Sequence, residues 1–169
     1  MLATASVTEP TGGSDPAGGR TVYTQEDDTF VINGRKCFIT NSHIADVMTV
    51  LAKSDEDPKA FCAFIVEKDM EGYKATREEH KVGMRGCNTG EQAFKNLRVP
   101  KENVLGEVGK GIRVVMSAIG DVGRGGMVGC ALGTQTACLE ASIKFANERI
   151  LYGKPIMKLQ GIQNKIAEM

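Results

Sequence analysis

Two short segments of the 169-residue chain carry residues that could bind a flat polar ligand. In the first, RKCFIT (Arg35–Thr40), a strand would place Phe38 and Thr40 on one face and Cys37 and Ile39 on the other. An aromatic ring with a hydroxyl two residues along can stack on a flat π-system and hydrogen-bond to its edge. The same pattern also suits a half-buried strand with a solvated threonine, so these residues alone leave both interpretations open.

The second segment is VTEPTGGSD, residues Val7–Asp15. Its Pro10, Gly12 and Gly13 predict an irregular turn, and glycines let backbone amides come close to a polar ligand. The polar side chains that crowd this turn are Thr8, Glu9, Ser14 and Asp15. Most turns of this kind have no ligand, so the segment gains meaning only in combination with others.

The elements that would position these residues are mainly strands, from Val7 to about Leu105. Asn33 and Gly34 between two alternating runs predict a hairpin with a tight turn. Further strands are indicated at Asp46–Ser54, at Ala60–Lys68, which is apolar enough to be buried on both sides, and at Glu91–Gly106. Several short strands separated by turns predict an antiparallel sandwich or barrel.

After Gly106 the period becomes helical. One apolar face of a long helix is predicted from Val128, Leu132, Leu139, Ile143, Ala146 and Ile150. The dense glycines between Gly120 and Gly126 predict a break in this helix. A second helix is predicted from Gly161 to Met169, and its pattern is still running at the last residue. We therefore expect an α+β chain that is a piece of a longer protein.

Composition excludes several classes of protein. The 21 basic and 21 acidic residues balance, which disfavours a nucleic-acid-binding protein. No apolar run approaches the roughly 20 residues of a membrane span. Two histidines and five cysteines without a CxxC pair make a metal site unexpected. Reduced thiols favour the cytoplasm, or the mitochondrial matrix in a eukaryote.

Taken in order, the motifs of this chain resemble those of the acyl-CoA dehydrogenase family of flavoproteins. The series is TEPTGGSD, INGRKCFITN, VGMRGCNT, RVPKENVLG, DVGR and ERILYGKPIMKLQGIQNKIAEM. It covers nearly the whole chain, and the first two motifs are the most specific. The resemblance implies a middle β-domain at residues 1–106 and the truncated start of a C-terminal helical bundle at residues 107–169.

The resemblance also implies roles for particular residues. Phe38 would lie against the flavin ring of FAD, and the Thr40 hydroxyl would hydrogen-bond near the ring nitrogen that accepts hydride. The other residues implied to contact FAD are Val7 and Thr8, with Arg149, Tyr152 and Gln160 reaching the FAD of a neighbouring subunit. Ser14, Asp121 and Arg124 would contact the acyl-CoA. The alternatives are a local serine turn for Ser14, a surface ion pair for Asp121 and Arg124, and a solvated helix end for Arg149, Tyr152 and Gln160.

The family reaction converts an acyl-CoA thioester to the trans-2-enoyl-CoA, with a carboxylate taking the α-proton and flavin taking a hydride. In some members the base precedes the arginine of the DVGR segment, but here that residue is Gly123. The base is therefore expected downstream, no catalytic residue is assigned here, and Glu9 belongs to the turn. We expect the 169-residue chain alone to be inactive and to hold little or no FAD.

The resemblance further implies a homo-oligomer, a dimer or tetramer, and an electron-transferring flavoprotein as electron acceptor. Two other functions stay open at this point. One is an acyl-CoA oxidase or flavin-dependent monooxygenase of the same fold, and the other is an assembly domain without a cofactor. A bound flavin excludes the assembly domain, and bleaching of that flavin by an acyl-CoA separates a dehydrogenase from a monooxygenase.

Overall fold

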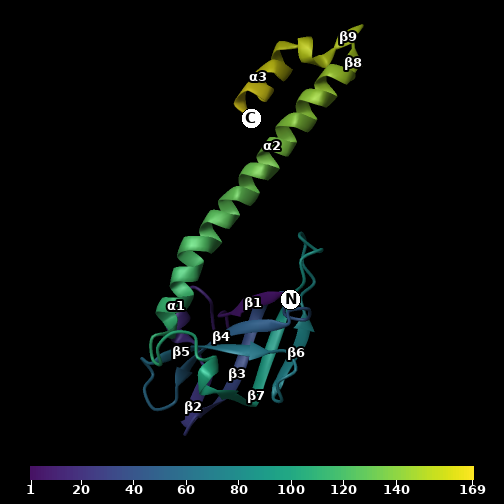
Figure 1. Ribbon diagram of the computed structural model, residues 1–169. Coiled ribbons are helices and arrows are strands. Elements are labelled where there is room, and N and C mark those ends of the chain that lie inside the picture. The colour runs from purple at the N-terminus through teal and green to yellow at the C-terminus, as the bar shows by residue number, and fades with distance from the viewer. The chain divides into compact units, whose positions relative to one another are not determined.

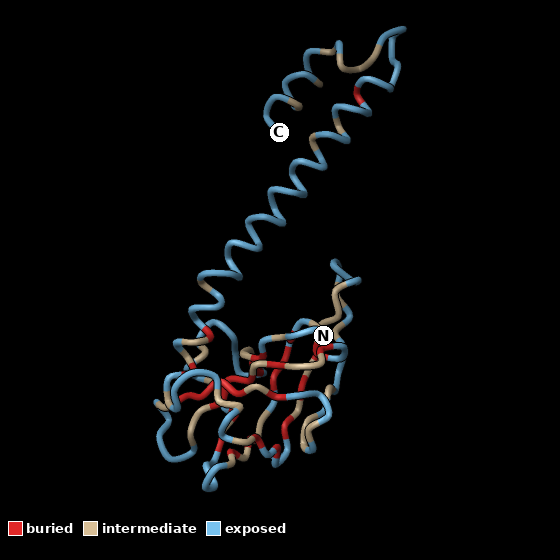
Figure 2. Tube along the Cα trace, in the orientation of Figure 1, coloured by how far each residue is buried: buried red, intermediate tan, exposed pale blue.

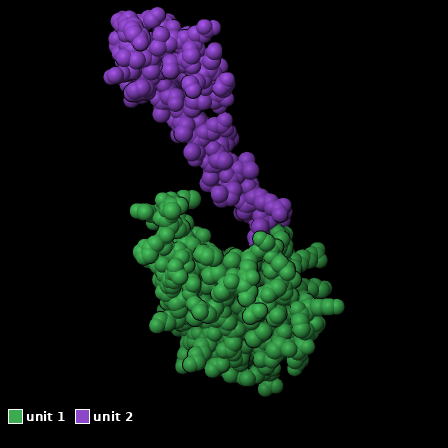
Figure 3. All heavy atoms as spheres, turned by 180° about the vertical axis from the view of Figure 1, so that it is seen from behind, with its two compact units in different colours: residues 1–117 green, residues 118–169 purple.

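The computed structural model describes residues 1–169, and Figure 1 shows their arrangement into strands and helices. The chain divides into two compact units, Met1–Ser117 and Ala118–Met169 (Figure 3). The strands of the first unit are β1 (Ala3–Ser6), β2 (Val22–Glu26), β3 (Thr29–Thr40), β4 (Val47–Ser54), β5 (Phe61–Glu67), β6 (Tyr73–Glu78) and β7 (Thr89–Pro100). Short 3-10 turns lie at Pro16–Gly18 and Lys101–Asn103.

These strands form one seven-stranded sheet in the order β1-β4-β2-β3-β7-β6, with β5 paired to the other edge of β4. Most pairings are antiparallel, as expected, but β1 and β2 both pair with β4 in parallel. The sheet is therefore mixed. Parallel neighbours need a crossover connection rather than a turn, so no local turn signal could have revealed them.

The core lies inside the curl of this sheet, which forms a half-barrel. Its buried apolar residues come from five strands, β2, β3, β4, β5 and β7. Figure 2 shows the buried positions gathered in these strands. Tyr23, Phe30 and Phe64 meet there with ring centroids 5.2–5.4 Å apart, a spacing typical of favourable aromatic pairs. A smaller cluster on the opposite face of β4 and β5 packs Val115 of α1 (Gly111–Ala118) against Leu51 and Phe61.

The predicted hairpin at Asn33 and Gly34 is wrong. β3 runs unbroken through both residues, and its hairpin with β2 turns at Asp27 and Asp28 instead. Asn33 and Gly34 lie opposite a bulge in β7, where the Asn33 side chain accepts a hydrogen bond from the Asn96 amide at 2.8 Å. A Cβ on Gly34 would lie 2.7 Å from the Cα of Thr21. The glycine serves close backbone approach rather than a turn.

Helical structure follows Lys110, as predicted. After α1 come a π-helical turn at Ile119–Gly123 and then α2 (Arg124–Glu148). The glycine-rich segment therefore changes the helical pitch without breaking the helix. Ile150, assigned above to the helical face, lies instead in a small hairpin of β8 (Ile150–Leu151) and β9 (Lys154–Pro155).

The second unit ends in a 3-10 turn at Ile156–Lys158 and in α3 (Gln160–Glu168), where the second helix was predicted. Ala146 is the buried residue of α2, whereas Val128 and Leu132 of the predicted apolar face are more than 60% exposed. No helix combines the length and the apolar character that a membrane crossing requires.

Candidate functional site

A bulge in β3 presents Phe38 to solvent. Between Lys36 and Ile39, β3 advances three residues while β7 advances two, from Gln92 to Gly90. The extra residue kinks the strand, and Phe38 adopts a left-handed φ of 56°. Its side chain is 64% exposed, and Thr40 is exposed as well. The predicted pairing of a ring and a hydroxyl on one accessible face is thus present, with Cys37 and Ile39 buried as expected.

The first turn segment lies directly beside this bulge. The Cys37 amide donates to the Thr8 carbonyl at 2.9 Å, and Lys36 Nζ donates to the Val7 carbonyl at 3.1 Å. The Thr4 hydroxyl donates to the Thr40 carbonyl at 2.5 Å. Segments that are 30 residues apart in the sequence therefore meet. The structure brings together the four predicted flavin contacts of the first unit: Val7, Thr8, Phe38 and Thr40.

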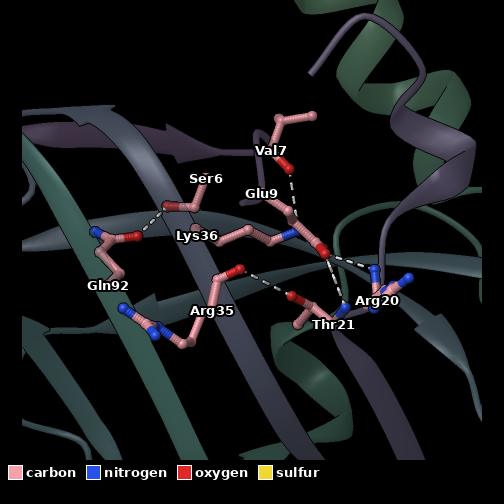
Figure 4. Close-up of polar contacts among 8 residues, drawn as sticks. All are labelled: Ser6, Val7, Glu9, Arg20, Thr21, Arg35, Lys36 and Gln92. Carbon is pink, nitrogen blue, oxygen red and sulfur yellow. Dashed lines mark hydrogen bonds and ion pairs between the residues drawn. The ribbon is translucent and has the colours of Figure 1, made fainter. Parts of the chain in front are cut away.

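A buried ion pair underlies this junction, as Figure 4 shows. Glu9 Oε1 and Lys36 Nζ are 2.7 Å apart, and the two side chains are only 5% and 2% exposed. Glu9 also accepts hydrogen bonds from the backbone amides of Arg20 and Thr21. Sequence reasoning missed Lys36, because alternation along β3 would have placed it on the exposed face with Phe38.

Burial and pairing act against each other on the pKa of both groups. Burial raises the pKa of Glu9, but the hydrogen bonds from Lys36 and from the Arg20 amide hold the pKa below its ordinary value. For Lys36 burial dominates and lowers the pKa, while Glu9 partly restores it. Glu9 is thus an ionised group committed to four contacts, which confirms its assignment to the turn rather than to proton transfer.

The remaining predicted residue of the first unit, Ser14, lines a small surface hollow. The other residues of this hollow are Thr11, Gly12, Gly13, Asp15 and Gly18. Backbone hydrogen bonds between Glu9 and Gly12 close the turn on one side. The Asp15 carboxylate accepts from the Ala17 amide at 3.1 Å and holds the other side. The hollow is shallow and polar, which suits a flexible polar chain better than an apolar one.

In the second unit, Asp121 and Arg124 lie at the π-helical turn. Asp121 is within the turn, and the Arg124 amide donates to the carbonyl of Ile119, five residues earlier. Both residues are exposed. Single π-helical turns are rare and occur frequently at functional sites. The turn rotates the helix face locally, and the sequence signal for it was the run of glycines around Gly123.

Arg149, Tyr152 and Gln160 lie near one another at the end of α2. Arg149 ends the helix, and its carbonyl accepts from the Ile156 amide at 2.9 Å, just beyond the β8–β9 hairpin. Tyr152 is at the tip of that hairpin, 89% exposed, with a left-handed φ of 53° followed by Gly153 at 74°. Gln160 begins α3. An exposed aromatic residue in this backbone region is uncommon and indicates a contact outside its own unit.

Comparison with protein families gives two matches. The profile of the acyl-CoA dehydrogenase middle domain matches residues 4–97, and that of the acyl-CoA dehydrogenase C-terminal domain matches residues 109–169. Among curated proteins, the short-chain specific acyl-CoA dehydrogenase of Megasphaera elsdenii is 38% identical over 171 residues, covering 99% of this chain and 44% of that protein.

Solved structures agree with these matches. Butyryl-CoA dehydrogenase from Megasphaera elsdenii superposes with a TM-score of 0.94 at 38% identity, over 99% of this chain and 44% of that one. An acyl-CoA dehydrogenase complexed with FAD from Bacillus anthracis gives a TM-score of 0.90 at 37% identity, over 98% of this chain and 28% of that one. The chain therefore spans less than half the length of the proteins it matches.

Proposed function

Because the chain belongs to the acyl-CoA dehydrogenase family, we propose that it supplies the FAD- and substrate-contacting middle portion of a dehydrogenase that converts an acyl-CoA to the trans-2-enoyl-CoA. The observation that carries this proposal is the junction at the β3 bulge. An exposed Phe38 stands next to Thr40 there, and backbone hydrogen bonds tie both to the Val7–Thr8 segment.

The residues of this junction fit a flavin. An exposed aromatic face can stack on the flat ring system, and one hydroxyl with nearby backbone groups can hydrogen-bond to its edge. FAD, when bound, would accept the hydride from the β-carbon of the acyl chain. Phe38 would hold the ring in place, and the Thr40 hydroxyl would donate near the nitrogen that receives the hydride.

The acyl-CoA would be contacted by the hollow at Ser14 and by the π-helical turn. The Ser14 hydroxyl and the hollow around it suit the amide groups of the pantetheine chain. Asp121 and Arg124 offer opposite charges and several donors for the same polar chain. No carboxylate here is suited to take the α-proton, because Gly123 has no side chain and Glu9 is held in its ion pair. The base is therefore a residue outside these 169.

Assembly and electron transfer complete the proposal. Arg149, Tyr152 and Gln160 would contact the FAD of a neighbouring subunit in a dimer or tetramer, which accounts for the exposure of Tyr152. An arginine and an amide can neutralise and hydrogen-bond the phosphate and ring groups of a dinucleotide. The electrons would pass from the flavin to an electron-transferring flavoprotein.

A chimera tests this function. Residues 1–169 replace the matching part of the Megasphaera elsdenii butyryl-CoA dehydrogenase, and bound FAD is measured from the visible absorbance of the purified protein. Phe38→Ala in this chimera should weaken FAD retention about fivefold or more, since a stacked aromatic pair contributes on the order of 1 kcal/mol. Thr40→Val should slow flavin reduction while leaving the retention of FAD unchanged. If both variants behave as the unaltered chimera does, the flavin platform is assigned wrongly.

A further inference from the structure

We propose that Glu9 and Lys36 are positioning residues for the flavin: their buried ion pair fixes the Val7–Thr8 backbone against the bulge that presents Phe38. The inference rests on the proposed function, because it gives the pair a role only if Phe38 and its neighbours contact the flavin. It adds two residues that touch neither the flavin nor the acyl-CoA but set the geometry of the residues that do.

Three consecutive residues of β3 carry the first part of the argument. Lys36 reaches the Val7 carbonyl with its ammonium group, and the Cys37 amide reaches the Thr8 carbonyl. Phe38, the next residue, turns outward in the left-handed region. The bulge thus faces the turn segment with two donors and faces solvent with a ring. Any shift of Lys36 moves both the Val7 carbonyl and the ring.

Anchors at both ends of the turn segment carry the second part. Before Val7, the Ser6 hydroxyl is hydrogen-bonded to the side chain of Gln92, which pairs with Lys36 across β3 and β7. After Thr8, Glu9 is held by Lys36 and by the amides of Arg20 and Thr21. Ser6, Glu9, Lys36 and Gln92 are all buried, whereas Val7 and Thr8 between the anchors are half-buried (Figure 4).

The physical properties of the pair favour positioning over simple stabilisation. A buried ion pair is often no more stabilising than apolar residues of similar volume, because both charges lose their hydration. An ion pair nevertheless imposes a specific separation and direction that an apolar contact does not. A left-handed residue such as Phe38 also persists only where its surroundings determine the backbone strongly. The pair supplies that constraint two residues before the ring.

The test uses the double variant Glu9→Gln/Lys36→Met in the 169-residue chain. Both charges disappear together, so no unpaired charge is left buried, and the glutamine carbonyl can still accept from the Arg20 and Thr21 amides. Hydrogen exchange of the Cys37 amide is measured by NMR, together with the urea midpoint of unfolding. The matched control is Arg35→Met, which removes the exposed Arg35–Glu91 ion pair from the neighbouring position of β3.

We expect the double variant to keep a urea midpoint close to that of the wild type. Its Cys37 amide should nevertheless exchange about tenfold faster, the change expected when a hydrogen bond to a charged group no longer restrains the segment. The Arg35→Met control should leave this amide unchanged. The same double substitution in the chimera should weaken FAD binding by a similar factor.

Two results would overturn the positioning role. One is a Cys37 amide that stays as protected as in the wild type. The other is faster exchange that merely follows a lower midpoint across the whole sheet, which would make the pair a stabilising contact only. These results are separable from a failure of the proposed function. If Phe38→Ala weakens FAD retention but the double variant does not, the flavin platform stands and the positioning role fails.

Discussion

The backbone at Phe38 gives a sharp prediction about stability without any flavin. Its φ of 56° lies in the left-handed region, which costs an L-residue roughly 1–2 kcal/mol and glycine nothing. At an ordinary strand position, glycine is less stable than alanine by about 0.5–1 kcal/mol. At position 38 the first term outweighs the second. Phe38→Gly should therefore be as stable as Phe38→Ala or more stable, although both variants lose the same ring.

Urea unfolding of the 169-residue chain measures this difference, and Ala5→Gly supplies the control. Ala5 is an exposed residue of β1 with ordinary strand geometry, so its change to glycine should lower the free energy of unfolding by about 0.5–1 kcal/mol. The two glycine-for-alanine comparisons should differ by about 1–2 kcal/mol, which is the cost of the left-handed backbone. Equal values at the two sites would show that the bulge does not hold residue 38 in this conformation, and the account of the flavin platform would lose its geometric basis.

Two other predictions concern the same region. Gly34→Ala should destabilise the first unit by about 1–3 kcal/mol, because its Cβ would lie 2.5 Å from Thr21 Oγ1; Gly126→Ala in α2, where nothing lies within 4 Å, should instead stabilise by up to about 1 kcal/mol, and thermal unfolding that ranks the two the other way would contradict both placements. The lowered pKa of Glu9 contributes stability above its ordinary value of about 4.3, and this contribution is lost as the pH falls through the folded-state pKa. Lys36 stays protonated throughout that range, so urea midpoints between pH 7 and pH 3 should fall more for the wild type than for Glu9→Gln/Lys36→Met; parallel curves would refute the assignment.

Much of the fold follows from local sequence signals. The strand at Phe61–Glu67 is apolar at nearly every position because β5 is covered on both faces, and periodicity alone predicts it. The Asn33-Gly34 signal failed because it reports only that the backbone can turn there. The collision of any Cβ with Thr21 is a long-range requirement for glycine that produces the same letters in the sequence.

The candidate site was predicted in its exposed residues and missed in its buried ones. Phe38 and Thr40 could be found because alternation predicts a shared face, and this holds despite the bulge. Lys36 could not, because a lysine in a strand is ordinarily solvated and its burial depends on a glutamate 27 residues away. The left-handed turn at Tyr152 and Gly153 was missed because tyrosine rarely adopts that backbone conformation.

Bleaching of the flavin tests the central claim most directly. The chimera of residues 1–169 with the Megasphaera elsdenii butyryl-CoA dehydrogenase is purified with FAD and mixed anaerobically with butyryl-CoA, while visible flavin absorbance is followed. We predict about one FAD per subunit and a loss of flavin absorbance when the thioester is added, as in the unaltered Megasphaera enzyme treated in parallel. A chimera that folds and assembles as that enzyme does, but holds no FAD or keeps its flavin oxidised in the presence of butyryl-CoA, would contradict the claim that these residues form the flavin and acyl-CoA contacts of a dehydrogenase.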